Sequence, residues 1–174
     1  MKMKSKTWIL AAAVLSVGTA ARAQAPNDAQ IAAIVVTANQ VDIDAGKLAE
    51  STGSNPQVKA FGKQMVADHS GVNKEAIKLV TRLGVKPEDN PTAKSIKTGG
   101  AENVNHLKQL KGAAFDKAYI DHEVAYHQQV LDALDKTLIP SAKNVEFKAL
   151  LVKVRPAFVA HLEHAKEIQA SLGK

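Results

Sequence analysis

Apolar residues recur at intervals of three and four along most of this 174-residue chain, and that period constrains its fold more than any other feature. Such spacing places side chains on one face of an α-helix. It continues over four long stretches, at about 27–50, 56–83, 113–138 and 145–172. No stretch of useful length alternates apolar and polar residues with the period of two that a half-buried β-strand requires. The sequence therefore predicts an all-α protein built from four long helices.

Capping and turn residues mark where these helices begin and end. Asn27, with Gln30 three residues later, forms a capping-box pattern at the start of the first stretch. Asn55 before Pro56 predicts the start of the second helix, since proline is favoured at the first helical position. Pro156 falls inside the fourth helix and removes one backbone donor, which predicts a kink there.

The stretch 84–112 reads differently from its neighbours. It holds Pro87, Pro91 and the pair Gly99 and Gly100, all of which interrupt regular structure. We expect a long crossover between the second and third helices, with a short helix over "AENVNHLKQLKG" (101–112). The third helix is expected to stop at Pro140. Together these features predict a four-helix bundle whose middle pair is not joined by a tight turn.

The first residues have the pattern of a secretory leader. A lysine-rich start precedes the apolar segment "WILAAAVLSVG" (8–18), and the small-residue motif Ala21-Arg22-Ala23 follows. The apolar segment is too short for a permanent membrane anchor. We therefore predict a signal peptide over 1–23, cleaved after Ala23, and a single bundle domain over 24–174. The protein is expected to be exported to the periplasm.

Removing this leader changes the charge balance. The chain has 23 Lys and Arg residues against 17 Asp and Glu. Four of the basic residues lie in the leader, which has no acidic residue, so the mature protein has 19 against 17. No basic cluster with interleaved aromatic residues remains, which argues against nucleic-acid binding. The absence of cysteine predicts a fold without disulfides and without a lipid anchor, and no second segment has the length of a membrane span.

Three histidines occupy positions in the helical stripes that would otherwise be apolar: His69, His127 and His161. Each lies near the middle of its helix, so in a bundle of matched lengths the three imidazoles are expected to meet in the core. Carboxylates on the same or neighbouring turns complete the candidate set, namely Glu123, Asp68, and Asp44 or its neighbour Asp42. Imidazole with carboxylate suits zinc, iron, copper or manganese.

The function of this cluster stays open at this point. The first hypothesis is a binding or stress-related bundle that holds a metal ion through the histidines. The second is a metal-free structural protein in which the histidines form a buried polar network, with a protein partner or a second copy meeting the helix faces or the crossover. The third, a redox enzyme, is disfavoured because no Glu-x-x-His motif, the signature of di-iron bundles, occurs in the chain. A non-enzymatic role is therefore favoured.

Three segments carry a resemblance to a known family: "MVADHSGVN" (65–73), "FDKAYIDHEVAYH" (115–127) and the Pro156…His161-Leu162 pair. With them the chain resembles an exported bacterial family of unknown function whose members often carry an outer-membrane label. The resemblance covers nearly all of the mature chain. It implies a ferritin-like four-helix fold in the periplasm or at the outer membrane, without an established activity. It also implies an acidic residue at Asp42 or Asp44, and Glu123 departs from the family's pattern of Gln or an apolar residue there.

Overall fold

The computed structural model describes residues 25–173, so the predicted leader lies outside the described part of the chain. These residues form helices and no strands, which confirms the predicted all-α class. The segments are α1 (Asp28–Thr52), α2 (Pro56–Arg82), α3 (Pro91–Leu107), α4 (Gly112–Ala133), the π-helical turn η1 (Leu134–Leu138), α5 (Ile139–Ser141) and α6 (Val145–Leu172). None of the helices in this part of the chain is long and apolar enough to span a membrane.

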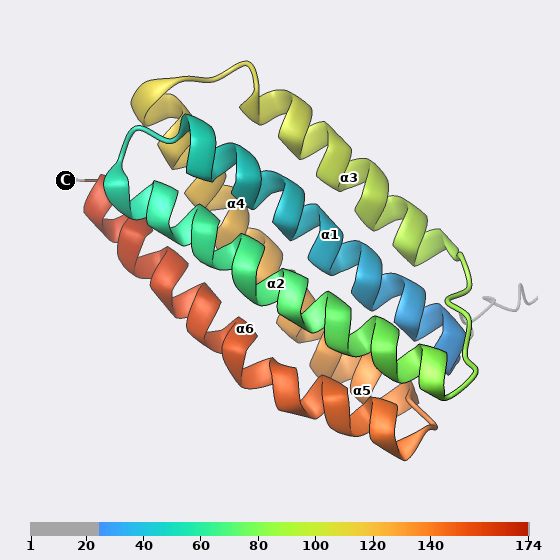
Figure 1. Ribbon diagram of the computed structural model, residues 1–174. Coiled ribbons are helices and arrows are strands. Elements are labelled where there is room, and N and C mark those ends of the chain that lie inside the picture. The colour runs from blue at the N-terminus through green and yellow to red at the C-terminus, as the bar shows by residue number, and fades with distance from the viewer. Residues whose placement is uncertain (1–24, 174) are drawn as a thin grey trace, which may run out of the picture.

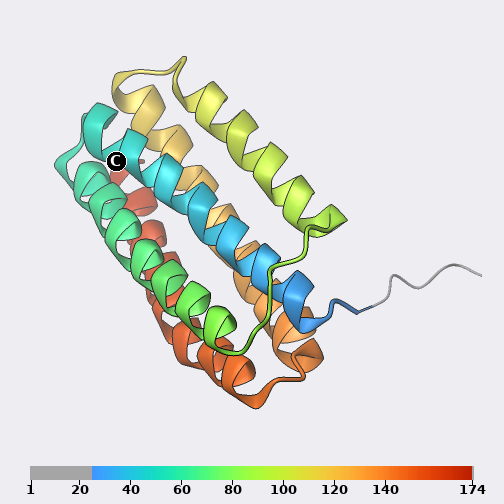
Figure 2. The ribbon, with the colours of Figure 1, turned by 45° about the vertical axis from the view of Figure 1, so that its right-hand side comes forward.

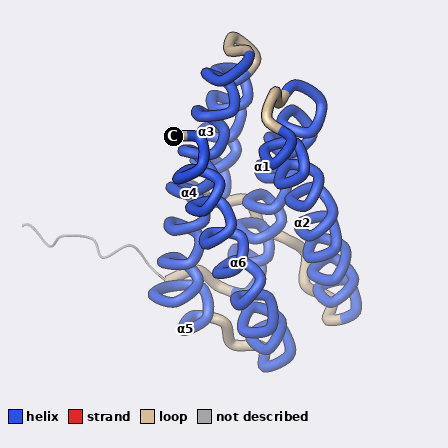
Figure 3. The backbone as a smooth tube through the Cα atoms, turned by 90° about the vertical axis from the view of Figure 1, so that its left-hand side faces the viewer, coloured by secondary structure: helices blue, strands red, loops and turns tan. Residues whose placement is uncertain are grey.

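Four of the helices, α1, α2, α4 and α6, pack side by side along their lengths, and α3 lies outside them against α1 (Figure 1). The chain runs up α1 and back along α2, and α3 then carries it along the bundle again (Figure 2). As a result α4 starts at the same end as α2, and α6 returns antiparallel to α4. Seen from the side, the backbone consists of long helical rods joined by short loops at the two ends (Figure 3).

The predicted helix starts are confirmed by their caps. Asn27 and Gln30 form the expected capping box at α1, with each side chain bonded to the other's backbone nitrogen. The side chain of Asn55 accepts from a backbone nitrogen at the start of α2. Asn144 does the same for two nitrogens at the start of α6. These bonds satisfy donors that have no partner inside their own helix.

The crossover is more helical than the sequence analysis predicted. The short helix expected over 101–112 is instead α3, which begins at Pro91 with Asn90 as its cap and ends at Leu107. The glycine pair that was expected to loosen this segment lies inside the helix. A Cβ on Gly100 would collide with the side chain of Val41, so the missing side chain lets α3 approach α1 closely.

The end of the third long helix also differs from the prediction. The helix does not stop before Pro140 but passes through η1, where the backbone nitrogen of Ile139 donates to the oxygen of Leu134 in the wider π pattern. Pro140 has no N–H to give and crowds the carbonyl four residues earlier, and the wider turn precedes it. Pro156 lies inside α6, which continues as one helix from Val145 to Leu172.

The core consists of two apolar clusters with a polar level between them. One cluster fills the end that holds the start of α1 and includes Leu134 and Phe147. The other fills the opposite end and includes Phe61 and Phe115. Between them, at mid-height, lie buried polar side chains from four helices: Asn39, Asp42, His69, Asn73, Glu123, His127 and His161. Most of the buried polar side chains that the structure describes therefore lie at one level, where α1, α2, α4 and α6 face each other, whereas Asn90 and Asp116 are buried at helix ends.

Candidate metal centre

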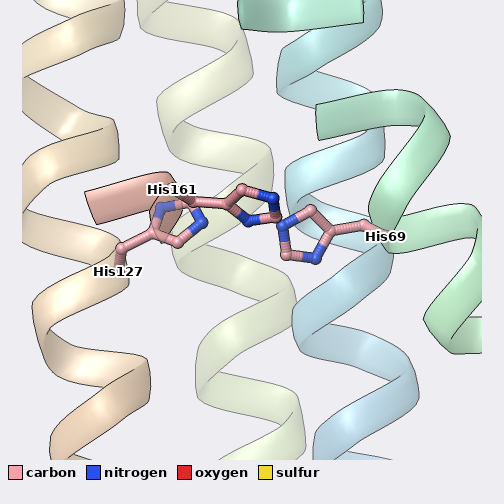
Figure 4. Close-up of side chains that lie close together, drawn as sticks. All are labelled: His69, His127 and His161. Atoms are coloured by element: carbon pink, nitrogen blue, oxygen red, sulfur yellow. The ribbon is translucent and has the colours of Figure 1, made fainter. Parts of the chain in front are cut away.

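The three histidines singled out by the helical pattern lie together in the core. His69 comes from α2, His127 from α4 and His161 from α6, and their rings point toward one another (Figure 4). The ring centroids are 5.3 to 5.6 Å apart. One nitrogen from each ring lies within 4.8 Å of the others, a spacing that a single ion can bridge. All three side chains are buried.

The outer nitrogen of His69 is held by Asn39 of α1. His69 Nδ1 lies 2.7 Å from the side-chain oxygen of Asn39, whose amide nitrogen donates to the backbone oxygen of Val35. That second bond fixes the amide so that its oxygen faces the ring. Because an amide oxygen only accepts, Nδ1 must carry the proton, and Nε2 presents a lone pair.

The other two rings also have one nitrogen that donates a hydrogen bond to the protein. His127 Nδ1 lies 3.0 Å from the backbone oxygen of Glu123, one turn earlier on α4, and donates to it. His161 Nε2 lies 2.9 Å from a carboxylate oxygen of Asp68 and donates there. The remaining nitrogens, His127 Nε2 and His161 Nδ1, then carry lone pairs. Metal-binding histidines characteristically have their other nitrogen held in this way.

The lone pairs that these tautomers create have no hydrogen-bond partner. His69 Nε2, His127 Nε2 and His161 Nδ1 are all buried without one. One carboxylate oxygen of Asp42, from α1, lies 3.2 Å from His69 Nε2 and 3.8 Å from His127 Nε2. Its other oxygen, Oδ1, also lacks a partner. Electron-rich atoms from four helices thus face one another, and a cation among them would satisfy all of them.

The pKa values of all three rings are lowered, which favours the neutral form that binds metal. Burial lowers the pKa of His69 well below its usual value, and the neighbouring His127 and His161 add to the effect. Burial lowers the pKa of His127 from 6.5 to about 4. Burial also lowers the pKa of His161, although Asp68 opposes that shift. Near neutral pH no proton therefore competes for the three inward nitrogens.

Two carboxyl groups share the same level. Glu123 is fully buried, and no N–H group donates to its side-chain oxygens, but its carboxyl group lies within hydrogen-bond reach of that of Asp42 when one of the two is protonated. With Asp42 and His127 it forms a second group whose ligand atoms lie within 4.8 Å of one another. Burial raises the pKa of Asp42 to about 7, and burial and the charge of Asp42 raise the pKa of Glu123 well above its usual range. The pair therefore favours a shared proton or a nearby cation over two free negative charges.

One predicted site residue is misplaced. Asp44 is exposed on α1 and accepts a hydrogen bond from Gln40, away from the histidines. Asp42, the neighbour left open beside it, occupies the site instead. The other predicted residues lie at the cluster: Glu123 is beside His127, and Asp68, with a side chain 45% exposed, contacts His161 from the rim.

Several polar neighbours of the site were not predicted from the sequence. Asn39 precedes Asp42 by three residues and so shares its helix face. This spacing could have indicated from the sequence that Asn39 lies near the site. His122 is half-buried with its ring stacked on Tyr126. Tyr119 is fully buried and its hydroxyl has no partner.

The family assignment rests on nearly the whole described chain. Residues 14–168 match the model of a family described as Domain of unknown function (DUF4142). The chain belongs to this family. The matched range includes the three histidines of the cluster together with Asp42 and Glu123, and it confirms the resemblance to a domain-of-unknown-function family. The ferritin-like fold that the resemblance implied stays a prediction. Neither the curated proteins nor the solved structures yield a match to the chain.

Proposed function

We propose that this protein is an exported, non-enzymatic helical bundle that binds one transition-metal ion in its core. His69, His127 and His161 would each supply one nitrogen, and Asp42 would supply a carboxylate oxygen. The observation that carries the proposal is the set of buried lone pairs without partners at one point, with each ring's other nitrogen already held by the protein. A metal-free polar network would be expected to pair these atoms with one another.

The donor set suggests the kind of metal. Three imidazole nitrogens and one carboxylate suit zinc, iron, copper or manganese better than magnesium or calcium, which prefer oxygen ligands. Glu123 would supply a further oxygen or hold the proton that it shares with Asp42. Export is part of the proposal because the leader pattern over 1–23 supports it. Appearance of the mature chain in the periplasmic fraction, beginning at Gln24, would test that part.

Metal content tests the central claim. The mature protein, purified without an affinity tag, would be exposed separately to zinc, iron, copper and manganese, dialysed, and examined by elemental analysis. We expect close to one ion per chain for at least one of these metals. His127→Leu should lose that ion while staying folded, because leucine fills a similar volume without a polar group in the core.

The matched control is His106→Leu. His106 is exposed on α3 and belongs to no group of potential ligands, so its loss should leave the metal content unchanged. Absence of metal from the unchanged protein after all four exposures would refute the proposal, as would an equal metal content in His127→Leu. The cluster would then be a structural network that fixes how the four helices align.

A further inference from the structure

The polar level opens onto an apolar cavity of about 210 Å³ inside the bundle. Four polar residues, Asn39, Asp42, His69 and His127, form one end of this cavity. The rest of its wall is mostly apolar and comes from α1, α3, α4, η1 and α6, including Ile34, Leu134, Leu138, Leu151, Val154 and Phe158. The cavity therefore has an apolar body with the candidate metal centre at one end.

We propose that this cavity binds a small apolar molecule carrying one hydroxyl group, with the hydroxyl at the metal ion and the apolar part against the leucines. The inference rests on the proposed function, because the ion supplies the contact for the oxygen. It adds a second ligand that the metal site alone does not require.

The size of the cavity sets the size of the molecule. An apolar cavity of about 150 Å³ is enough to bind benzene. The present cavity of about 210 Å³ leaves room for one ring with a short alkyl substituent. Two leucines of the π-helical turn, Leu134 and Leu138, belong to its wall, and π-turns occur frequently at functional sites.

The chemistry of the polar end sets the functional group. His69 Nε2, His127 Nε2 and Asp42 Oδ1 are acceptors, so this end attracts a cation or a hydrogen-bond donor. Three of the four proposed metal donors line the cavity and His161 does not, so a molecule in the cavity lies beside the ion. A hydroxyl oxygen can coordinate that ion while the hydroxyl group donates a hydrogen bond to Asp42. A carboxylate in its place would be repelled by the negative charge of Asp42.

The cavity also reaches the surface. Gln129 of α4 lines it and is exposed, and Ile96 of α3 lies half-buried at its wall. A small molecule would enter between these two helices. Ala133, one turn after Gln129 on α4 and also part of the wall, offers a position from which a larger side chain would fill the cavity.

Cobalt(II) provides a direct test, because its visible spectrum reports its coordination. The protein would be loaded with cobalt, its cobalt content measured, and 4-ethylphenol titrated in, with ethylbenzene as the probe that lacks the hydroxyl. We expect a saturable change in the cobalt spectrum with 4-ethylphenol and none with ethylbenzene. Ala133→Phe should weaken 4-ethylphenol binding about tenfold or more, because it fills the space for the ring, while cobalt content stays the same.

The control variant is Ala114→Phe, which places the same side chain at an exposed position of α4 and should bind like the unchanged protein. Cobalt bound without a spectral response to 4-ethylphenol would overturn the inference and leave metal binding standing. An equal response in Ala133→Phe would overturn it too. If no cobalt binds, the cobalt content shows this before any phenol is added and the inference fails, and the zinc, iron, copper and manganese contents of the same protein then show whether the proposed function fails with it.

Discussion

Asp116 and Asp42 are both buried carboxylates, each only 2% exposed, but their surroundings differ in kind. Asp116 lies at one end of the bundle, where its two oxygens accept hydrogen bonds from the backbone nitrogens of Ser54 (2.9 Å) and Asn55 (2.8 Å). It holds the turn between α1 and α2. Asp42 lies at mid-height and faces histidine lone pairs, with Oδ1 unpartnered. Burial alone therefore does not distinguish the two carboxylates, whereas their hydrogen-bond partners do.

The largest loss of stability is expected at Asp116, where both carboxylate oxygens accept hydrogen bonds. Asp116→Ala removes two charge-assisted hydrogen bonds and leaves two backbone donors without partners, so the free energy of unfolding should fall by about 3 kcal/mol or more. Urea denaturation followed by circular dichroism measures it. Asp44→Ala, at an exposed carboxylate, should change stability by less than about 0.5 kcal/mol. Equal losses in the two variants would show that Asp116 does not hold the turn.

The closeness of packing also differs between the contact of α1 with α2 and the polar level that holds Asp42. A Cβ on Gly62 would lie 2.7 Å from the backbone oxygen of Gly46 and 2.8 Å from the Cβ of Ala49. The space between α1 and α2 at this point therefore has no room for a side chain on Gly62. Gly62→Ala should therefore destabilise the protein by about 2 kcal/mol. Ala133 lines the cavity, so Ala133→Leu points a larger side chain into empty space and should be tolerated. Thermal unfolding of both variants measures the contrast.

Gly71→Ala is the control for the glycine prediction, since it lies on the same helix with nothing within 4 Å of the added Cβ. There the substitution should stabilise the protein by up to about 1 kcal/mol, because alanine favours the helix. If Gly62→Ala is as stable as Gly71→Ala, the close approach of α1 and α2 is not a constraint on the fold.

The sequence indicated the histidines because each of them interrupts an otherwise apolar stripe. It did not decide between Asp42 and Asp44, and the reason lies in α3. Val41 packs against Gly100 of α3, while Asp42 faces the core of the bundle, so α1 is buried on more than one side. A single stripe cannot be assigned to such a helix without the position of α3. The place of Asn39 on the same helix face as Asp42 could be predicted from the sequence, but its hydrogen bond to His69 could not, since that partner lies 30 residues away.

The next prediction concerns Asp68, at the partly exposed edge of the site, where the expected effect is on metal affinity and not on stability. Asp68 holds His161 from a partly exposed position, so Asp68→Ala should leave the fold of the metal-free protein nearly unchanged. Metal affinity should fall about 10- to 100-fold, because the ring loses the partner that orients it. Competition with a metal-binding dye measures the affinity. Glu163→Ala removes one exposed carboxylate from α6 and should bind metal normally; a similar loss there would mean that only net charge matters.

A small effect on stability, and the sharpest contrast with Asp116, is expected at Asp42. Asp42→Asn removes a charge that faces lone pairs and Glu123, so the metal-free protein should keep its stability within about 1 kcal/mol or gain slightly. At Asp116 the same change to asparagine turns an amide toward a backbone donor and should destabilise the protein. Metal affinity should fall only in Asp42→Asn. Urea denaturation with and without metal separates the cases, and a loss of stability at Asp42 equal to that at Asp116 would mean that both carboxylates serve the fold alone.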